Sequence, residues 1–176
     1  MRTKIAALVV LMCSTGAMLG SGASSAHATG YPVYIPTVWV TGPATAATTI
    51  AVNHGSILST QLLSVQGDGI STACTYNGAT MYGYWWTCAG PIQQMYITTG
   101  SGNDHISVAG VAATVNANAG ADTVNVFDSP ASKDSVDCGQ YDHAQDTIYK
   151  DSKDALTHCS SGGDVVHPYA PPVALP

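Results

Sequence analysis

Aspartate is the residue type of this sequence that is best suited to chemistry. All eleven acidic residues of the 176-residue chain are aspartates, and ten of them lie after Gly100. Asp104 and Asp122 are eighteen residues apart, and each follows a short stretch of small and turn-forming residues. A short-armed carboxylate suits tight turns, and it is also an oxygen ligand for a hard cation such as Ca²⁺. The sequence therefore predicts either acidic turns or a calcium site at these two positions.

The elements that would position these aspartates repeat every nine residues. Apolar residues recur at this interval between polar neighbours, at Ile97, Ile106, Val115 and Val124. An apolar residue flanked by polar ones is typical of a short strand with one buried face. Self-similarity at a fixed period indicates stacked units that share one core. Residues 37–41, 49–53 and 62–65 also resemble strands, and helix signals are almost absent, so we expect an all-β fold.

Residues 99–107 resemble the RTX (hemolysin-type) nonapeptide, in which glycines precede an aspartate and an apolar strand residue. Only the first glycine of the motif is replaced, by Thr99, and residues 117–125 are similar in a looser way. The resemblance implies an exported actinobacterial calcium-binding protein with degenerate repeats. It implies a short right-handed parallel β-roll or β-helix, a solenoid, with a strand-rich N-terminal cap. In such a roll two repeats make one coil, so turns eighteen residues apart stack on one side.

The resemblance also implies where calcium would bind. The ion would lie between the turns at 99–104 and 117–122, held by two carboxylates and by carbonyl oxygens. The implied ligands are Thr99, Gly100, Gly102, Asp104, Asn118, Gly120 and Asp122. The opposite side has Ala113 where the motif has aspartate, so one side alone is expected to bind. We expect weak affinity, on the order of 10⁻⁴ to 10⁻³ M as in extracellular calcium modules. The alternative is a solenoid that has lost calcium.

Cysteines provide a second constraint. Four cysteines lie after residue 28: Cys74, Cys88, Cys138 and Cys159. An even number in an exported chain predicts two disulfides, and sequence proximity favours Cys74–Cys88 and Cys138–Cys159 among three possible pairings. A zinc site is the alternative, although the spacings are not of the C-x-x-C kind. Residues 133–159 also resemble the closing segment of exported actinobacterial repeat proteins, which implies that Cys138–Cys159 pins the last coil. A three-residue slip of phase is expected at residues 129–131.

The segment between Cys74 and Cys88 is rich in aromatic residues, and Asn77-Gly78 is a candidate turn for a hairpin there. Such a cluster usually packs against a core. The alternative is an exposed recognition patch for a cell-surface glycan or protein, formed by Tyr82, Tyr84, Trp85 and Trp86. This alternative gives a second hypothesis for function, an extracellular adhesive module without calcium dependence.

Residues 1–28 have the features of a secretory signal peptide: a basic start, a short apolar run and a small-residue cleavage site after Ala28. The other predicted segments are the cap at 29–94, the RTX-like β-roll at 95–161 and a flexible proline-rich tail at 162–176. We therefore expect a secreted, extracellular protein.

Charge and motifs exclude several function classes. Cleavage would leave three lysines against eleven aspartates, a net charge of −8. Such a chain, without arginine, is a poor ligand for nucleic acid, and no segment after the leader could insert into a membrane. Adjacent pairs such as Asp104-His105 point to opposite faces of a strand, and no serine-nucleophile elbow occurs. We predict no enzymatic activity; paired aspartates for glycoside hydrolysis are the remaining catalytic alternative.

Overall fold

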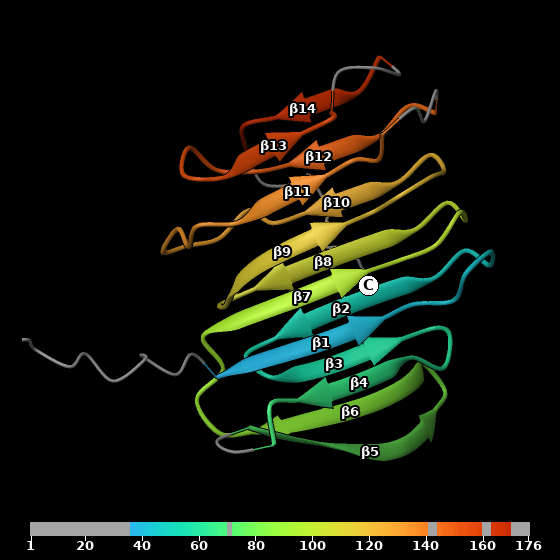
Figure 1. Ribbon diagram of the computed structural model, residues 1–176, viewed down its shortest axis with the longest axis vertical. Helices are drawn as coiled ribbons and strands as arrows, with labels where there is room; N and C mark the ends of the chain where they lie inside the picture. The colour runs from blue at the N-terminus through green and yellow to red at the C-terminus, as the bar shows by residue number, and fades with distance from the viewer. Residues whose placement is uncertain (1–35, 70–71, 141–143, 160–162, 170–176) are drawn as a thin grey trace, which may run out of the picture. The chain divides into compact units, whose positions relative to one another are not determined.

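The computed structural model describes residues 36–69, 72–140, 144–159 and 163–169, and the regular secondary structure of these residues is entirely β-strand. Their fourteen strands form two mixed sheets (Figure 1). The six-stranded sheet contains, in spatial order, β13 (Ala155–Thr157), β11 (Ser135–Asp137), β9 (Ala112–Asn116), β7 (Gln94–Thr98), β1 (Thr37–Thr41) and β4 (Ser64–Gly67). The eight-stranded sheet contains β14 (Val165–His167), β12 (Thr147–Tyr149), β10 (Thr123–Asn125), β8 (His105–Ala109), β2 (Thr49–Asn53), β3 (Ser56–Ser59), β6 (Gly83–Ala89) and β5 (Ala73–Thr80). The all-β prediction is confirmed, and the described residues include no helix able to cross a membrane.

Strands of the second half of the chain alternate between the two sheets and pair in parallel. β7 pairs with β9, and β8 with β10, at an offset of eighteen residues, which is twice the nine-residue period. The offset grows to 21 between Thr114 and Ser135 and to 24 between Thr123 and Thr147. The first increase matches the predicted three-residue slip at 129–131. Each tier of the structure therefore consists of one strand from each sheet.

The N-terminal part of the chain belongs partly to the same stack. β1 and β2 pair in parallel with β7 and β8, so they form its first tier. The segment between β2 and β7 pairs in antiparallel fashion: β3, β6 and β5 extend one sheet, and β4 is the last strand of the other. Within the described residues, β3, β6, β5 and β4 lie beyond the first tier, at one end of the two sheets. At the other end β14 is a strand, although it lies in the predicted flexible tail.

The aromatic segment forms a hairpin, but not with the predicted turn. Cys74 lies opposite Cys88 in the β5–β6 register, and the two residues form a disulfide. The chain reverses at residues 81–82, between β5 and β6. Asn77-Gly78 lies inside β5, where the register shifts between Tyr76 and Gly78. Asn-Gly therefore forms a bulge here, since the positive φ of Gly78 suits a bulge as well as a turn.

The core lies between the two sheets and follows from alternation along each strand. Val38 and Val40 in β1 are at most 1% exposed, whereas Trp39 between them is 44% exposed. The same alternation in β2 and in β7 to β12 contributes to one buried cluster that extends from Val38 to Ile148. Sheets that face each other in this way bury alternate residues and leave the others to solvent.

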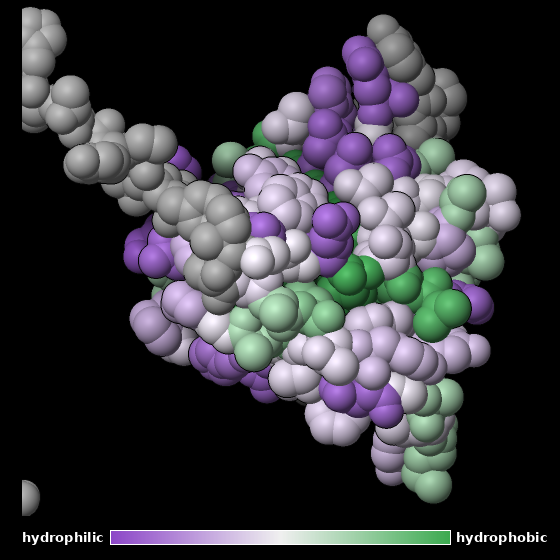
Figure 2. Space-filling view, turned by 60° about the horizontal axis from the view of Figure 1, so that its bottom comes forward, coloured by the Kyte–Doolittle hydropathy of each residue, from purple (hydrophilic) through white to green (hydrophobic). Residues whose placement is uncertain are grey.

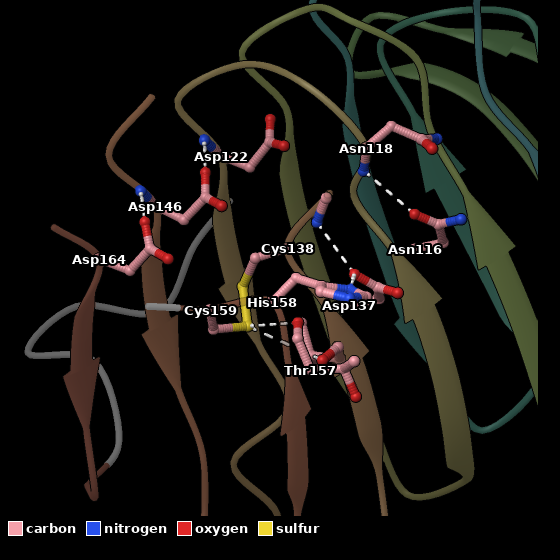
Figure 3. The surroundings of a disulfide bond; sticks show 12 residues. Asn116, Asn118, Asp122, Asp137, Cys138, Asp146, Thr157, His158, Cys159 and Asp164 are labelled. Atoms are coloured by element: carbon pink, nitrogen blue, oxygen red, sulfur yellow. Dashed lines mark hydrogen bonds and ion pairs between the residues drawn. A yellow bond between two sulfur atoms is a disulfide. The ribbon is translucent and has the colours of Figure 1, made fainter. Parts of the chain in front are cut away.

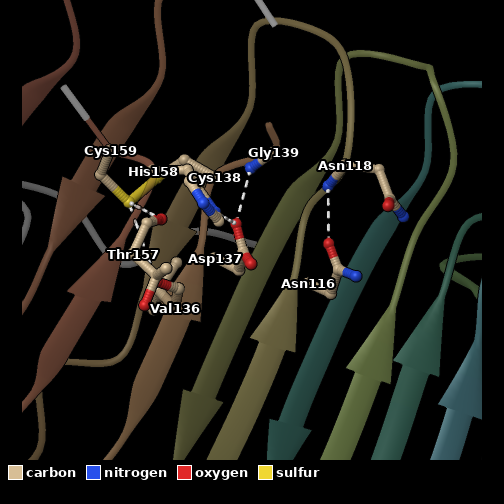
Figure 4. Close-up of polar contacts among 9 residues, drawn as sticks. All are labelled: Asn116, Asn118, Val136, Asp137, Cys138, Gly139, Thr157, His158 and Cys159. Carbon is tan, nitrogen blue, oxygen red and sulfur yellow. Dashed lines mark hydrogen bonds and ion pairs between the residues drawn. A yellow bond between two sulfur atoms is a disulfide. The ribbon is translucent and has the colours of Figure 1, made fainter. Parts of the chain in front are cut away.

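Asparagine and aspartate side chains end several strands locally. Asn116 accepts a hydrogen bond from the N–H of Asn118 at 3.2 Å, and Asp137 accepts one from the N–H of Gly139 at 3.0 Å (Figure 4). Asn125 does the same with the N–H of Phe127 at 3.2 Å. A side chain that bonds the backbone two residues further on turns the chain out of the sheet.

Ile106 tests the packing of this core. It is fully buried in β8, between β2 and β10. The change Ile106→Val removes one methylene and is expected to lower the free energy of unfolding by about 1 kcal/mol in urea denaturation. Ser107→Ala, which changes an outward-facing neighbour, is the control and should have a smaller effect. Equal stability of Ile106→Val and the unchanged protein would show that this layer is not tightly packed.

Candidate functional site

The two turns that the sequence singles out lie directly next to each other. Turn 99–104 precedes β8 and turn 117–122 precedes β10, and these strands are neighbours. The N–H of Ala119 donates to the carbonyl oxygen of Gly100 at 3.3 Å, and the N–H of Thr123 donates to that of Asp104 at 2.8 Å. The predicted ligand residues are therefore brought together in two consecutive tiers.

Glycine is required where these turns stack. A Cβ atom at Gly120 would lie 2.2 Å from the carbonyl oxygen of Gly102, and the φ of Gly120 is +127°. A Cβ atom at Gly100 would lie 2.2 Å from the carbonyl oxygen of Ala44, in the turn of the tier before. Three turns thus approach each other more closely than any side chain would allow.

Aspartates that precede strands of the eight-stranded sheet form one continuous row, which we call the first aspartate row: Asp104, Asp122, Asp146 and Asp164 (Figure 3 shows the last three). One carboxylate oxygen, Oδ1, of each accepts a hydrogen bond from a backbone N–H one tier earlier. The distances are 2.7 Å from Thr48 to Asp104, 2.7 Å from Asp104 to Asp122, 2.8 Å from Asp122 to Asp146 and 3.0 Å from Asp146 to Asp164. The row therefore fastens the tiers by hydrogen bonds that the strands alone do not supply.

Asp104 has an oxygen that this row leaves unsatisfied. Its side chain is 0% exposed, and Oδ2 is buried without a hydrogen-bond partner. No ion pair involves Asp104 within the described part of the chain. Burial raises the pKa of Asp104, against the lowering effect of the Thr48 N–H, the Thr99 hydroxyl and the Gly100 N–H. The Thr99 hydroxyl and the Gly100 N–H are close enough to lower the pKa of Asp104, but neither forms a hydrogen bond with Oδ2. A buried carboxylate in this state is unstable unless a proton or a cation joins it.

Atoms of two other predicted ligand residues, Thr99 and Asn118, have partners in the neighbouring turn. The Asn118 amide donates to the carbonyl oxygen of Thr99, and the Thr99 hydroxyl donates to that of Ala117 at 3.0 Å. Asn118 acts as a donor here through Nδ2, and its Oδ1 is a separate acceptor atom. Each bonded carbonyl oxygen retains a second lone pair, so Thr99, Gly100 and Asp104 can still offer oxygen toward an ion.

A second aspartate row, Asp134 and Asp154, lies in the turns that precede strands of the six-stranded sheet. Asp134 accepts a hydrogen bond from the N–H of Ala113 at 2.6 Å, and Asp154 accepts one from that of Asp134 at 3.1 Å. The residue at 113 is alanine, as the sequence indicates, but its backbone is held by a carboxylate one tier later. The nonapeptide pattern does not predict this row. Its signal is an aspartate two residues before an apolar strand residue, as in Asp134-Ser-Val136.

Burial favours the protonated form of the carboxyl groups in this second row. Burial raises the pKa of Asp134 to about 6, and the nearby carboxylate of Asp154 contributes in the same direction, against the Ala113 N–H. Burial also raises the pKa of Asp154. The Ser132 hydroxyl contacts both Asp128 and Asp134, although it has one hydrogen to donate. A protonated Asp134 can donate to this hydroxyl while the hydroxyl donates to Asp128.

Both predicted disulfides are present, Cys74–Cys88 and Cys138–Cys159. The second joins the end of β11 to the residues after β13, neighbouring strands of one sheet (Figure 3). Cys138 also lies near Asp146 and Asp164, with the three ligand atoms within 4.8 Å of one another. Its sulfur is bonded to Cys159, however, so these four cysteines offer no thiolate for the zinc alternative.

The predicted aromatic patch is divided by strand alternation. Trp85 is 41% exposed and Tyr82 is 73% exposed, but Trp86 is 4% exposed and Tyr84 packs partly against the core. Trp86 therefore belongs to the core, as does most of Tyr84. Trp85, Tyr82 and the exposed Met81 border a hollow of about 450 Å³ beside Leu58 on the outer face of the eight-stranded sheet. Figure 2, which brings the lower end of Figure 1 forward, shows apolar residues (green) among polar ones on the visible face.

Comparisons of the chain with protein-family models, with curated proteins and with solved structures found no significant match. Its functional interpretation therefore depends on the residues and geometry described above.

Proposed function

We propose that this chain is an exported calcium-binding structural module, folded as a short right-handed parallel β-roll that calcium orders outside the cell. The parallel pairing of β7 with β9 and of β8 with β10 at eighteen residues supports the roll. Two disulfides suit an oxidising, extracellular compartment. The proposed signal peptide, residues 1–28, lies outside the described residues.

The observation that carries the proposal is the buried Oδ2 of Asp104. This oxygen has no hydrogen-bond partner, and it lies in the turn that resembles a calcium-binding repeat. A bound calcium ion would supply the positive charge that the carboxylate lacks. Asp104 would hold it together with carbonyl oxygens of Thr99 and Gly100, and with the adjacent turn at 117–122. Because so few charged ligands contribute, weak binding is expected.

Calcium that binds the folded chain alone would stabilise it. At millimolar calcium and a dissociation constant on the order of 10⁻⁴ to 10⁻³ M, the gain is about 1–2 kcal/mol, and the melting temperature should rise by a few degrees. Thermal denaturation of the exported chain in chelator and in about 5 mM calcium measures this rise. Magnesium at the same concentration should have a smaller effect, because it demands a stricter octahedral geometry.

Two variants sharpen the calcium test. Asp104→Asn keeps an oxygen for the Thr48 N–H but removes the charge, so it should abolish the calcium-dependent rise without unfolding the chain. Asp164→Asn, at the exposed end of the same row, is the matched control and should retain the rise. An equal rise in Asp104→Asn and the unchanged protein would exclude this site, and no rise in the unchanged protein would exclude the function.

A second candidate function, recognition of a cell-surface protein, is favoured by the exposure of Trp85 beside the apolar hollow. An aromatic side chain that borders such a hollow is typical of an interaction anchor. Retention of labelled protein by whole cells of the source bacterium tests this function. Trp85→Ser should lower retention, whereas Tyr169→Ser, at the opposite end of the sheet, should not. Unchanged retention of Trp85→Ser would rule out the patch.

A further inference from the structure

A second aromatic feature lies on the outer face of the six-stranded sheet, away from both proposed sites. Trp39 in β1 and Tyr96 in β7 occupy opposed positions in the parallel register. Their side chains are 44% and 41% exposed, whereas Val38 and Ile97 are buried. The two rings are nearly parallel, with an interplanar angle of 11° and centroids 6.3 Å apart. Neither residue was predicted as functional from the sequence.

The strands that surround this pair are neutral, as the concentration of ten of the eleven aspartates after Gly100 allows. No charged residue occurs in β1, β4, β7 or β9, the four neighbouring strands of this part of the sheet. Amide and hydroxyl side chains accompany the rings at exposed or half-buried positions: Thr41, Gln66, Gln94, Thr98 and Thr114. On these four strands the surface offers aromatic faces and neutral hydrogen-bonding groups together. The carboxylate of Asp68, directly after β4, accepts the N–H groups of Thr37 and Thr72.

Part of this surface is already ordered. Gln66 lies opposite Trp39 in the antiparallel register with β4. The Gln94 amide donates to the Thr114 hydroxyl at 3.3 Å and to the carbonyl oxygen of Met95 at 3.4 Å. Side chains held in place before binding lose less conformational freedom when a ligand arrives.

We propose that the Trp39–Tyr96 pair is a binding platform for a neutral polysaccharide. The C–H face of a pyranose ring is apolar and packs on an aromatic ring, while its hydroxyls need neutral donors and acceptors such as Gln66 and Gln94. The exposed part of each ring offers apolar surface against which a sugar ring can pack. Phosphate- or carboxylate-bearing polymers would be repelled by the net negative charge of the chain. A cross-strand aromatic pair also stabilises a sheet, and binding of a polysaccharide is the property that distinguishes the platform from that role.

Affinity electrophoresis in native gels tests the platform with hydroxyethylcellulose, a soluble β-1,3-glucan and a mannan as neutral probes and alginate as an anionic probe. The exported chain should be retarded by at least one neutral polymer and not by alginate. Trp39→Ala and Tyr96→Ala should each weaken the retardation, with dissociation constants higher by about tenfold. Tyr96→Phe, which keeps the ring, should bind like the unchanged protein.

The matched control is Tyr149→Ala, which removes an aromatic ring that stacks on His167 in the other sheet. It should leave retardation unchanged. Circular dichroism and melting curves of every variant identify any loss of fold. Absence of retardation by all three neutral polymers, retardation by alginate alone, or equal binding by a folded Trp39→Ala protein would each overturn the proposal.

Discussion

Replacing Asp122 with alanine is expected to lower the free energy of unfolding by about 2–4 kcal/mol, even in chelator. Asp122 is 1% exposed and accepts the N–H of Asp104 at 2.7 Å. Alanine would leave this N–H without its acceptor in the interior, and it would remove a carboxylate that bridges two tiers. Urea denaturation at a fixed pH and in excess chelator measures the loss independently of calcium.

Asp122→Asn is the informative partner of that variant. Asparagine keeps an oxygen at the position of Oδ1 and removes the buried charge, so it should cost less than half as much as alanine. Similar losses for alanine and asparagine would mean that the charge, not the backbone hydrogen bond, is what stabilises the tiers. A loss below about 0.5 kcal/mol for alanine, the range of ordinary surface changes, would contradict the structural role of the row.

The protein is expected to become more stable as the pH falls from about 7 to about 4, the reverse of the usual behaviour of acid-rich proteins. The pKa of Asp134 is raised from 3.8 to about 6. A group whose pKa is raised on folding contributes stability that is complete below its unfolded pKa and is lost as the pH rises through its folded pKa. A shift of about two pKa units corresponds to about 3 kcal/mol. The raised pKa values of Asp104 and Asp154 act in the same direction.

Urea midpoints at several pH values in chelator test this dependence, and Asp134→Asn is the matched variant. Asparagine still accepts the Ala113 N–H and does not titrate, so its stability should vary less across this pH window. Stability that falls steadily from pH 7 to pH 4, or an unchanged pH slope in Asp134→Asn, would show that Asp134 is not held protonated. Saturating calcium should remove the contribution of Asp104, because the ion competes with the proton.

Local sequence patterns predicted which residues form strands better than they predicted which strands pair. Strands at 37–41 and 49–53 followed from alternation and are confirmed. Their parallel pairing with β7 and β8 joins residues such as Thr37 and Gln94, and no period relates positions so far apart. The Asn77-Gly78 turn was wrong because the preference of Asn-Gly for positive φ does not distinguish a turn from a bulge.

The candidate site was predictable in part for a similar reason. The constant offset of eighteen residues predicted that Asp104 and Asp122 lie in neighbouring turns, and the structure places them there. The second row was missed because its first tier has Ala113 where the motif has aspartate, so no row of acids was expected on that side. The donor role of Asn118 depends on a neighbouring turn, and Trp39 and Tyr96 meet only across two strands. Such relations arise from tertiary register and have no local signature.

Isothermal titration of the exported chain with calcium tests the central claim most directly, because it measures binding without unfolding the protein. The account predicts a saturable heat with about one ion per chain and a dissociation constant on the order of 10⁻⁴ to 10⁻³ M. It also predicts the loss of this heat in Asp104→Asn, with Asp164→Asn unchanged. No saturable heat up to about 10 mM calcium, or the same heat in Asp104→Asn, would contradict the assignment of Asp104 as a calcium ligand.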